Sequence, residues 1–222
     1  RPPCRASRRP PPTRWLRLLA ELWPDDGESD DALQELFGLT ALTGDTRFQK
    51  ACLIVGPKRA GKGPLLRVLR ALAGEDNTCA PVLAQLGERF GLQSLIGKRL
   101  AIISDARLSG RADVASIAET ILRISGEDAV TVERKHLTDW TGKLPTRFVI
   151  ASNELPSLQD ASAALSSRFV VLRLTQRFYG AEDQALTDTL MGELPSILLW
   201  SMDGLDRLRR RGRLLQPASG KE

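Results

Sequence analysis

The sequence predicts an α/β fold with a central parallel sheet flanked by helices, and three observations lead to it. Four short apolar runs are typical of strands buried on both faces, and three of them end in glycine or a polar residue. Segments with helical periodicity separate these runs, as in repeated strand-helix units. The length of 222 residues and the 42% share of apolar residues suit one large domain with a small appendage.

The chain begins with a basic, proline-rich stretch and two helical patterns. Residues 1–12 hold five prolines and four arginines, so we expect a linker. Residues 13–47 form the expected helical subdomain, with one helix from Thr13 to Trp23 and another from about Asp30 to Thr43. Residues 48–205 carry the α/β pattern, and residues 206–222 are expected to form a basic tail. Because the first residue is arginine, we expect a fragment of a longer protein or an incomplete reading frame.

The four expected strands bring polar residues to one edge of the sheet. Ligands of parallel sheets bind beyond the carboxyl ends of the strands. Gly56, Asp105 and Asn153 lie at the carboxyl ends of three of the runs, so we expect them to lie near a ligand. The runs are Lys50–Gly56, residues 99–104, Arg147–Ser152 and Phe169–Leu174.

The most specific motif is a phosphate loop between the first strand and a helix expected from Pro64 to Ala73. Backbone N–H groups of such a loop surround a β-phosphate, and its lysine reaches the β and γ oxygens. A glycine-rich turn with a chance lysine is the alternative, which the flanking strand and helix disfavour. The loop residues are Gly56, Pro57, Lys58, Arg59, Ala60, Gly61, Lys62 and Gly63.

One position departs from the full motif. Gly63 and Pro64 follow Lys62, so the serine or threonine hydroxyl that usually binds Mg²⁺ is missing. Proline is tolerated in the first turn of a helix, because its missing N–H would be unpaired there. We therefore expect Mg²⁺ to have one protein ligand fewer and hydrolysis to be slow.

Three more residues are candidates for the chemistry of a nucleotide site. Asp105 is expected to hold Mg²⁺ directly or through water, with a helix or loop cap as the alternative. Asn153 is expected to contact the γ-phosphate or the attacking water, with a turn residue as the alternative. Arg168 is expected to enter a neighbouring subunit's site as an arginine finger, unless it is an exposed surface arginine. Ala106 replaces the second acid that many ATPases carry, and Glu154 is a possible substitute.

Residues 129–149 predict a β-hairpin with a basic tip formed by Arg134, Lys135 and His136. Such a tip suits contact with a phosphate backbone, and a solvated turn is the alternative. A zinc site is not expected, because His136 is the only histidine and the three cysteines form no CxxC pair. The sparse cysteines favour the cytoplasm, and no apolar run is long enough for a membrane span.

The net charge of +5 is concentrated at the two ends of the chain. Residues 1–17 hold six arginines, residues 207–213 hold five, and the residues between them are net acidic. The overall charge is therefore weak support for a nucleic-acid-binding face.

Taken together, the motifs resemble those of superfamily 3 helicase domains. They resemble most closely the ATPase part of phage and plasmid primase-helicases from mobile elements. The resemblance covers about residues 13–212. The matching segments are the phosphate loop GPKRAGKG, the second nucleotide strand RLAIISDARL, the hairpin element SGEDAVTVERKH, the sensor segment LPTRFVIASNELP and the arginine-finger segment LSSRFVVLRL.

This resemblance implies an AAA+ fold, a usually hexameric ring and ATP-driven translocation on single-stranded or forked DNA. It implies phosphate binding by Lys62, Mg²⁺ binding by Asp105, a sensor role for Asn153 and action in trans by Arg168. Relatives commonly carry threonine at the position of Pro64.

The resemblance also assigns a DNA contact and further domains. It places Lys135 and His136 in the central pore of the ring, and it suggests Arg123 as another phosphate contact. A primase or other domain would precede Arg1 in the whole protein.

Two other functions remain open from the sequence. The loop GPxxxGKG also resembles that of adenylate kinases, which favours a small nucleotide kinase, but this leaves the hairpin, Asn153 and Arg168 without a role. Pro64 and Ala106 favour a catalytically impaired prophage remnant that oligomerises or binds DNA.

Overall fold

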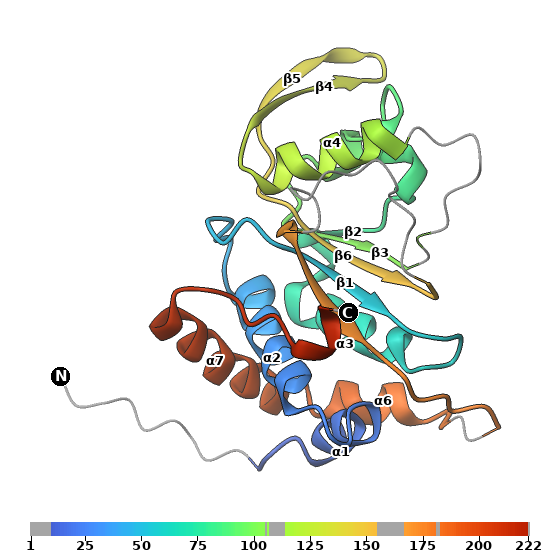
Figure 1. Cartoon of the computed structure of the whole chain (residues 1–222). Coiled ribbons are helices and arrows are strands. Elements are labelled where there is room, and N and C mark those ends of the chain that lie inside the picture. Colours follow the sequence, from blue (N-terminus) through green and yellow to red (C-terminus); the bar gives the residue numbers. More distant parts are fainter. Residues whose placement is uncertain (1–9, 105, 107–113, 155–166, 181–182, 222) are drawn as a thin grey trace.

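The computed structural model describes residues 10–104, 106, 114–154, 167–180 and 183–221. At its centre is a five-stranded parallel sheet in the order β2-β3-β6-β1-β7 (Figure 1). The four predicted strands are confirmed, while the two-residue strand β2 is too short to leave a pattern in the sequence. The strands are β1 (Ala51–Val55), β2 (Thr78–Cys79), β3 (Leu100–Ile103), β6 (Arg147–Ser152) and β7 (Phe169–Arg173).

Helices cover both faces of the sheet, so the predicted α/β class is confirmed (Figure 1). The helices α1 (Thr13–Leu22), α2 (Gly27–Leu42), α3 (Lys62–Ala73), α6 (Leu186–Gly192) and α7 (Leu194–Arg211) share one core. The helix α4 (Val114–Ser125) covers the other face. Short 3-10 turns occupy Glu75–Asn77, Leu83–Gly87, Gln93–Leu95 and Ala218–Gly220.

Strand β1 shows why these residues form a central strand. All five of its side chains are buried, and successive residues enter opposite cores. Cys52 and Ile54 pack with α3, whereas Leu53 and Val55 pack with α4. A strand buried on both faces needs an unbroken apolar sequence, and the run in β1 has one.

The N-terminal helices pack closely against α7. A Cβ atom at Gly38 would lie 2.2 Å from the carbonyl oxygen of Ser201, and one at Gly204 would lie 2.5 Å from the backbone of Gln34. The missing side chains therefore let α2 and α7 approach each other. The separation of residues 13–47 from the rest as a subdomain remains a prediction, since these helices share their core with α3 and the sheet.

Helix α7 continues beyond residue 205 to Arg211, so the basic tail expected from residue 206 begins inside a helix. Arg207 Nε donates to Glu35 Oε1 at 3.0 Å, and Arg211 donates to the other carboxylate oxygen. Glu35 is fully buried, and a buried carboxylate is stable only when it is paired. Arg207 and Arg211, two of the five arginines in the basic stretch 207–213, therefore neutralise the buried carboxylate of Glu35.

The predicted hairpin is also confirmed. Strands β4 (Ala129–Arg134) and β5 (Leu137–Lys143) form a separate antiparallel pair that projects beyond α4 (Figure 1). Within the part of the chain that the structure describes, no helix is both long and apolar enough to cross a membrane.

Candidate functional site

The phosphate loop leaves β1 and enters α3, and two of its glycines are required by its shape. Gly61 has a φ of +88°, a left-handed conformation that favours glycine, and it caps the amino end of α3. A Cβ atom at Gly56 would lie 2.7 Å from the carbonyl oxygen of Leu174, just after β7. The loop therefore has the conformation that the glycine pattern predicts.

The structure brings Lys62 and Asn153 together, as the sequence predicts. Lys62 Nζ donates to Asn153 Oδ1 at 3.1 Å and to the carbonyl oxygen of Pro57 at 2.8 Å. It also donates to the carbonyl oxygen of Gly56. The ammonium group thus lies among oxygen acceptors at the carboxyl ends of β1 and β6, where phosphate oxygens would be favourable partners.

The segment after β7 braces the phosphate loop. The N–H of Phe178 donates to the carbonyl oxygen of Arg59 at 3.0 Å, and Arg59 has a φ of +61°. The guanidinium carbon of Arg59 lies 4.5 Å from the centre of the Tyr179 ring. Sequence reasoning missed this contact, because no local pattern links residues so far apart in the chain.

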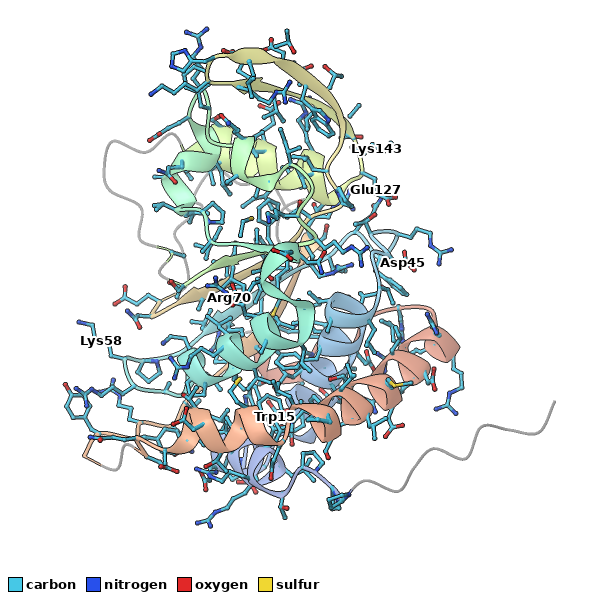
Figure 2. The ribbon with its side chains drawn as sticks, turned by 180° about the vertical axis from the view of Figure 1, so that it is seen from behind. Trp15, Asp45, Lys58, Arg70, Glu127 and Lys143 are labelled. Atoms are coloured by element: carbon cyan, nitrogen blue, oxygen red, sulfur yellow. The ribbon has the colours of Figure 1, made fainter. Side chains whose placement is uncertain are left out.

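A cleft of about 840 Å³ opens beside the loop. Among the described residues that line it, Lys58, Arg173 and Arg177 are cationic and Glu154 is acidic. Figure 2 shows Lys58 pointing away from the body of the molecule. The excess of positive charge suits an anionic ligand such as a nucleotide. The lining residues are Val55, Gly56, Pro57, Lys58, Asn153, Glu154, Arg173, Leu174, Thr175, Arg177 and Tyr179.

The acidic part of the candidate site is only partly described. Asp105 lies outside the described residues, so its role as a Mg²⁺ ligand remains a prediction. Ala106 is buried and its N–H donates to the carbonyl oxygen of Ala151 at 3.1 Å, so its methyl group belongs to the core. Glu154 is exposed and lines the cleft. Within the described ranges, no three His, Cys, Asp or Glu side chains are grouped as metal ligands.

Pro64 lies in the first turn of α3, as the sequence predicts, although the helix begins at Lys62, two residues before its expected start. Gly63, between them, is exposed, and the nearest atom to a Cβ there would be Arg67 Nη1 at 3.4 Å. The position directly after the loop lysine can therefore accept a small side chain.

Arg168 lies at the opposite end of the sheet from Lys62. It directly precedes β7, and Phe169 of β7 pairs with Ala51 at the start of β1. The five residues of β1 span about 16 Å, so Arg168 is remote from the phosphate loop of its own chain. Its Nη1 donates to the side-chain oxygen of Gln49. Arg168 is therefore not part of the group of residues around Lys62, and its expected action in a neighbouring subunit's site remains a prediction.

The hairpin exposes two of the three predicted basic residues at its tip. Lys135 and His136 form the turn and are exposed. His136 has a φ of +61°, in the left-handed region where histidine is enriched among non-glycine residues. Arg134 Nε instead donates to the carbonyl oxygen of Thr138 at 2.7 Å, so this guanidinium closes the turn.

Arg123, expected as a further phosphate contact, lies in the last turn of α4. Its Nη2 donates to the carbonyl oxygen of Ala129, at the start of the hairpin, at 3.2 Å. Its contact is therefore with the base of the hairpin rather than with the phosphate loop.

The segment before β3 braces the hairpin at two points. Gln93 Oε1 accepts from the N–H of Lys135 at 3.1 Å, and Arg89 Nε pairs with Glu133 Oε2 at 2.5 Å. Phe90 is 42% exposed, and the guanidinium carbon of Arg89 lies 5.3 Å from the centre of its ring. The sequence analysis did not single out Arg89, Phe90 or Gln93. The adjacent arginine and phenylalanine are the one local pattern that could have pointed to this segment.

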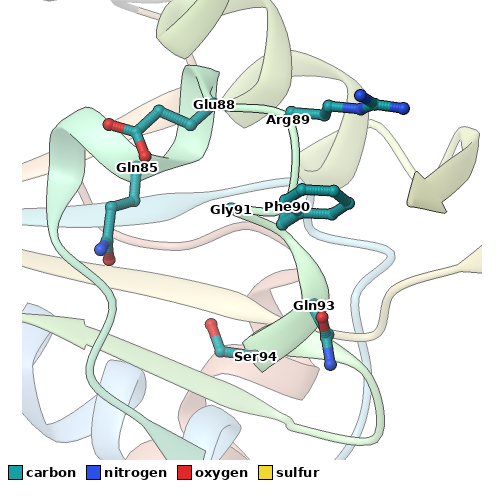
Figure 3. Close-up of a pocket in the computed structure, with 7 residues that line it drawn as sticks. All are labelled: Gln85, Glu88, Arg89, Phe90, Gly91, Gln93 and Ser94. Atoms are coloured by element: carbon teal, nitrogen blue, oxygen red, sulfur yellow. The ribbon is translucent and has the colours of Figure 1, made fainter. Parts of the chain in front are cut away.

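The same segment surrounds a hollow of about 610 Å³ (Figure 3). Arg89 and Phe90 extend to one side of the turn at Gly91, whereas Gln85 and Glu88 lie on the other. The hollow is lined by Gln85, Glu88, Arg89, Phe90, Gly91, Gln93 and Ser94.

Solved structures share this fold. An apo structure of the NrS-1 C terminal region matches with a TM-score of 0.69 and 16% identity, over 87% of this chain and 48% of that one. The A form apo structure of the same region gives 0.68 and 16% identity, over 87% and 47%. This chain thus spans about half the length of those solved chains. A JCV helicase structure reaches only 0.44, at 17% identity, over 90% of this chain and 67% of that one.

A family model matches residues 54–168, which is more than half of the 222-residue chain. The matched stretch contains the phosphate loop, the hairpin, Asn153 and Arg168. The chain therefore belongs to DUF5906, a family of unknown function.

Proposed function

We propose that this chain is an ATP-dependent DNA translocase domain of the superfamily 3 helicase type, from a phage or plasmid replication protein. The observation that carries the proposal is the 3.1 Å contact of Lys62 with Asn153 beside a glycine-rich loop. A loop lysine and an amide on the neighbouring strand tip are groups that can contact the same γ-phosphate. The order of the remaining motifs along the chain supports a helicase over other phosphate-loop proteins.

Each residue of the site has a role in this proposal. The loop N–H groups and the amino end of α3 bind the β-phosphate, while Lys62 neutralises the β and γ oxygens. Asn153 orients the γ-phosphate or the attacking water. We infer that Asp105 and the phosphates hold Mg²⁺, which would neutralise charge on the transferred group.

The position of Arg168 supports a ring of identical subunits, which we propose to be a hexamer. Arg168 precedes the first residue of β7, too far from the phosphate loop of its own chain to contact a nucleotide there. We propose an interface at which the amino ends of the sheet strands of one subunit face the phosphate loop of the next. The positive charge of Arg168 would then stabilise the transition state in the neighbouring subunit's site.

The exposed hairpin tip supports DNA as the partner. Lys135 and His136 project from the end of a two-stranded arm, and Arg89 and Phe90 lie on the segment that braces it. A cation at a tip and an aromatic ring beside it are groups that bind phosphate and unpaired bases. We propose single-stranded or forked DNA in the bacterial cytoplasm, with a primase domain elsewhere in the whole protein.

A slow or inactive ATPase is the second candidate, and two observations favour it. Pro64 supplies no hydroxyl in the first turn of α3, and the buried Ala106 supplies no second acid. Such a protein would bind ATP and DNA, and assemble, without efficient turnover.

Phosphate release measured with and without single-stranded DNA tests the proposal. We expect that the chain hydrolyses ATP and that single-stranded DNA increases the rate. Adenosine monophosphate is included as a possible acceptor of the phosphoryl group, to test for kinase activity. ATP binding without hydrolysis would favour the impaired form. Phosphoryl transfer to the monophosphate would favour a nucleotide kinase, and no ATP binding would exclude the proposed site.

A further inference from the structure

We propose that Tyr179 is the stacking platform for the base of the bound nucleotide, with Arg59 packed against the other face of its ring. This inference rests on the proposed ATP site and names its base-binding end. The expected ligand class is a purine nucleoside triphosphate.

The sheet order indicates where the base lies. The γ-phosphate end of the site is marked by Asn153, which follows β6. Strand β7 lies on the other side of β1 from β6. A nucleotide whose γ-phosphate meets Asn153 therefore extends its ribose and base toward the segment that follows β7. Tyr179 belongs to that segment and lines the same cleft as Pro57 and Lys58.

The ring of Tyr179 is open to a ligand on one face. Tyr179 is 72% exposed, although the guanidinium carbon of Arg59 lies 4.5 Å from the ring centre. A planar base can stack on the face that Arg59 leaves open, and the cation strengthens an aromatic platform of this kind. A purine covers more of a tyrosine ring than a pyrimidine does, so ATP and GTP should bind more tightly than CTP or UTP.

The platform is fixed to the phosphate loop. The carbonyl oxygen of Arg59 accepts the N–H of Phe178 at 3.0 Å, and the Phe178 side chain packs against the core. These contacts anchor the residue next to Tyr179 to the phosphate loop. Such preorganisation lowers the entropy lost when a ligand binds at both points.

Comparing two ligands distinguishes the contribution of the base to binding from that of the phosphates. We would measure the equilibrium binding of ATP and of inorganic tripolyphosphate, which has no base, to Tyr179→Ala, Tyr179→Phe and the unmodified chain. Loss of one base stack should weaken ATP binding by about tenfold in Tyr179→Ala, with tripolyphosphate unaffected. Tyr179→Phe should bind ATP normally, as should Met202→Ala, a control that removes an exposed apolar side chain from α7.

A spectroscopic measurement checks the contact directly. Tyr179 is the only tyrosine in the sequence, so 3-fluorotyrosine labelling gives a single ¹⁹F site. ATP should shift its resonance through the ring current of the base, and tripolyphosphate should not. Unchanged ATP affinity in Tyr179→Ala, or equal shifts with both ligands, would overturn the inference. If the unmodified chain binds neither ligand, the proposed ATP site itself is wrong.

Discussion

Lys62 Nζ lies 3.1 Å from Asn153 Oδ1, which joins the first residue of α3 to the tip of β6. The two side chains proposed to meet the γ-phosphate are therefore bonded to each other. Phosphate oxygens of a bound nucleotide could accept from Lys62 Nζ and from the amide nitrogen of Asn153, so the two side chains can act on the same phosphate group.

Removing the loop lysine should stop hydrolysis without unfolding the protein. We expect Lys62→Ala to lower the rate of ATP hydrolysis by about 10²-fold or more, because a cation aimed at the transferred phosphate is lost. Its melting temperature should change little, because backbone groups build the loop. Normal hydrolysis by a folded Lys62→Ala protein would exclude the phosphate-loop function.

The features predicted correctly are those with a local signature. The runs of β1, β3, β6 and β7 are apolar because both faces of the sheet are covered. The loop glycines and the hairpin tip are short motifs that can be recognised without knowledge of the fold.

The features that were missed depend on tertiary contacts. Arg59 meets Tyr179, and Gln93 meets Lys135, across long stretches of chain that carry no shared pattern. Arg134 has the composition of a DNA contact, yet the geometry of the turn directs its guanidinium to Thr138. Sequence alone therefore indicates which residues are basic, but not which of them are already paired.

The role of the hairpin tip in DNA binding can be tested by comparing a lysine at the tip with a lysine at the other end of β5. We expect Lys135→Ala to weaken binding to single-stranded DNA and to reduce the slope of log affinity against log salt by about 1. Lys143→Ala removes the same charge from an exposed position at the other end of β5, and should have little effect. Binding measured at several salt concentrations distinguishes them. Equal slopes for both variants would show that the tip is only a solvated turn.

Arg168 can be tested by mixing variants. When each is expressed alone, Arg168→Ala should lose about 10³-fold or more of the hydrolysis rate, and Lys62→Ala about 10²-fold or more. Co-expressed, they should regain part of it, because some interfaces then join an intact Arg168 to an intact Lys62. Hydrolysis by the purified mixed assemblies is the measurement. Mixed rings that stay inactive would argue against action across the interface.

Asp30 should make the stability of the fold depend on pH. Burial raises the pKa of its carboxyl group to about 6, with contributions from Asp31 and Asp26. Among the described residues, its Oδ1 is buried and has no hydrogen-bond partner. The folded state therefore binds the proton more tightly than the unfolded state, so stability falls as pH rises from about 4 to about 6 and stays lower above that.

Asp30→Asn should remove this dependence. We expect the variant to be more stable at pH 7 by roughly 1 kcal/mol, after allowance for partial solvent screening. Asp25→Asn, at an exposed position before α2, should change stability by less than about 0.5 kcal/mol. Urea unfolding at pH 4 and pH 7 measures both. An Asp30→Asn protein with the same pH slope as the unmodified chain would contradict the assignment.

The position after the loop lysine offers a gain-of-function test. Gly63 is exposed, and a Cβ there would meet only the flexible end of Arg67 at 3.4 Å, so a serine fits without displacing backbone. Its hydroxyl would supply the Mg²⁺ ligand that the loop lacks. We expect Gly63→Ser to hydrolyse ATP faster, or to reach half-maximal rate at a lower Mg²⁺ concentration. Gly63→Ala adds the same Cβ without the oxygen and controls for the stiffer helix start. If the two variants respond identically in a Mg²⁺ titration, the missing hydroxyl is not what limits this site.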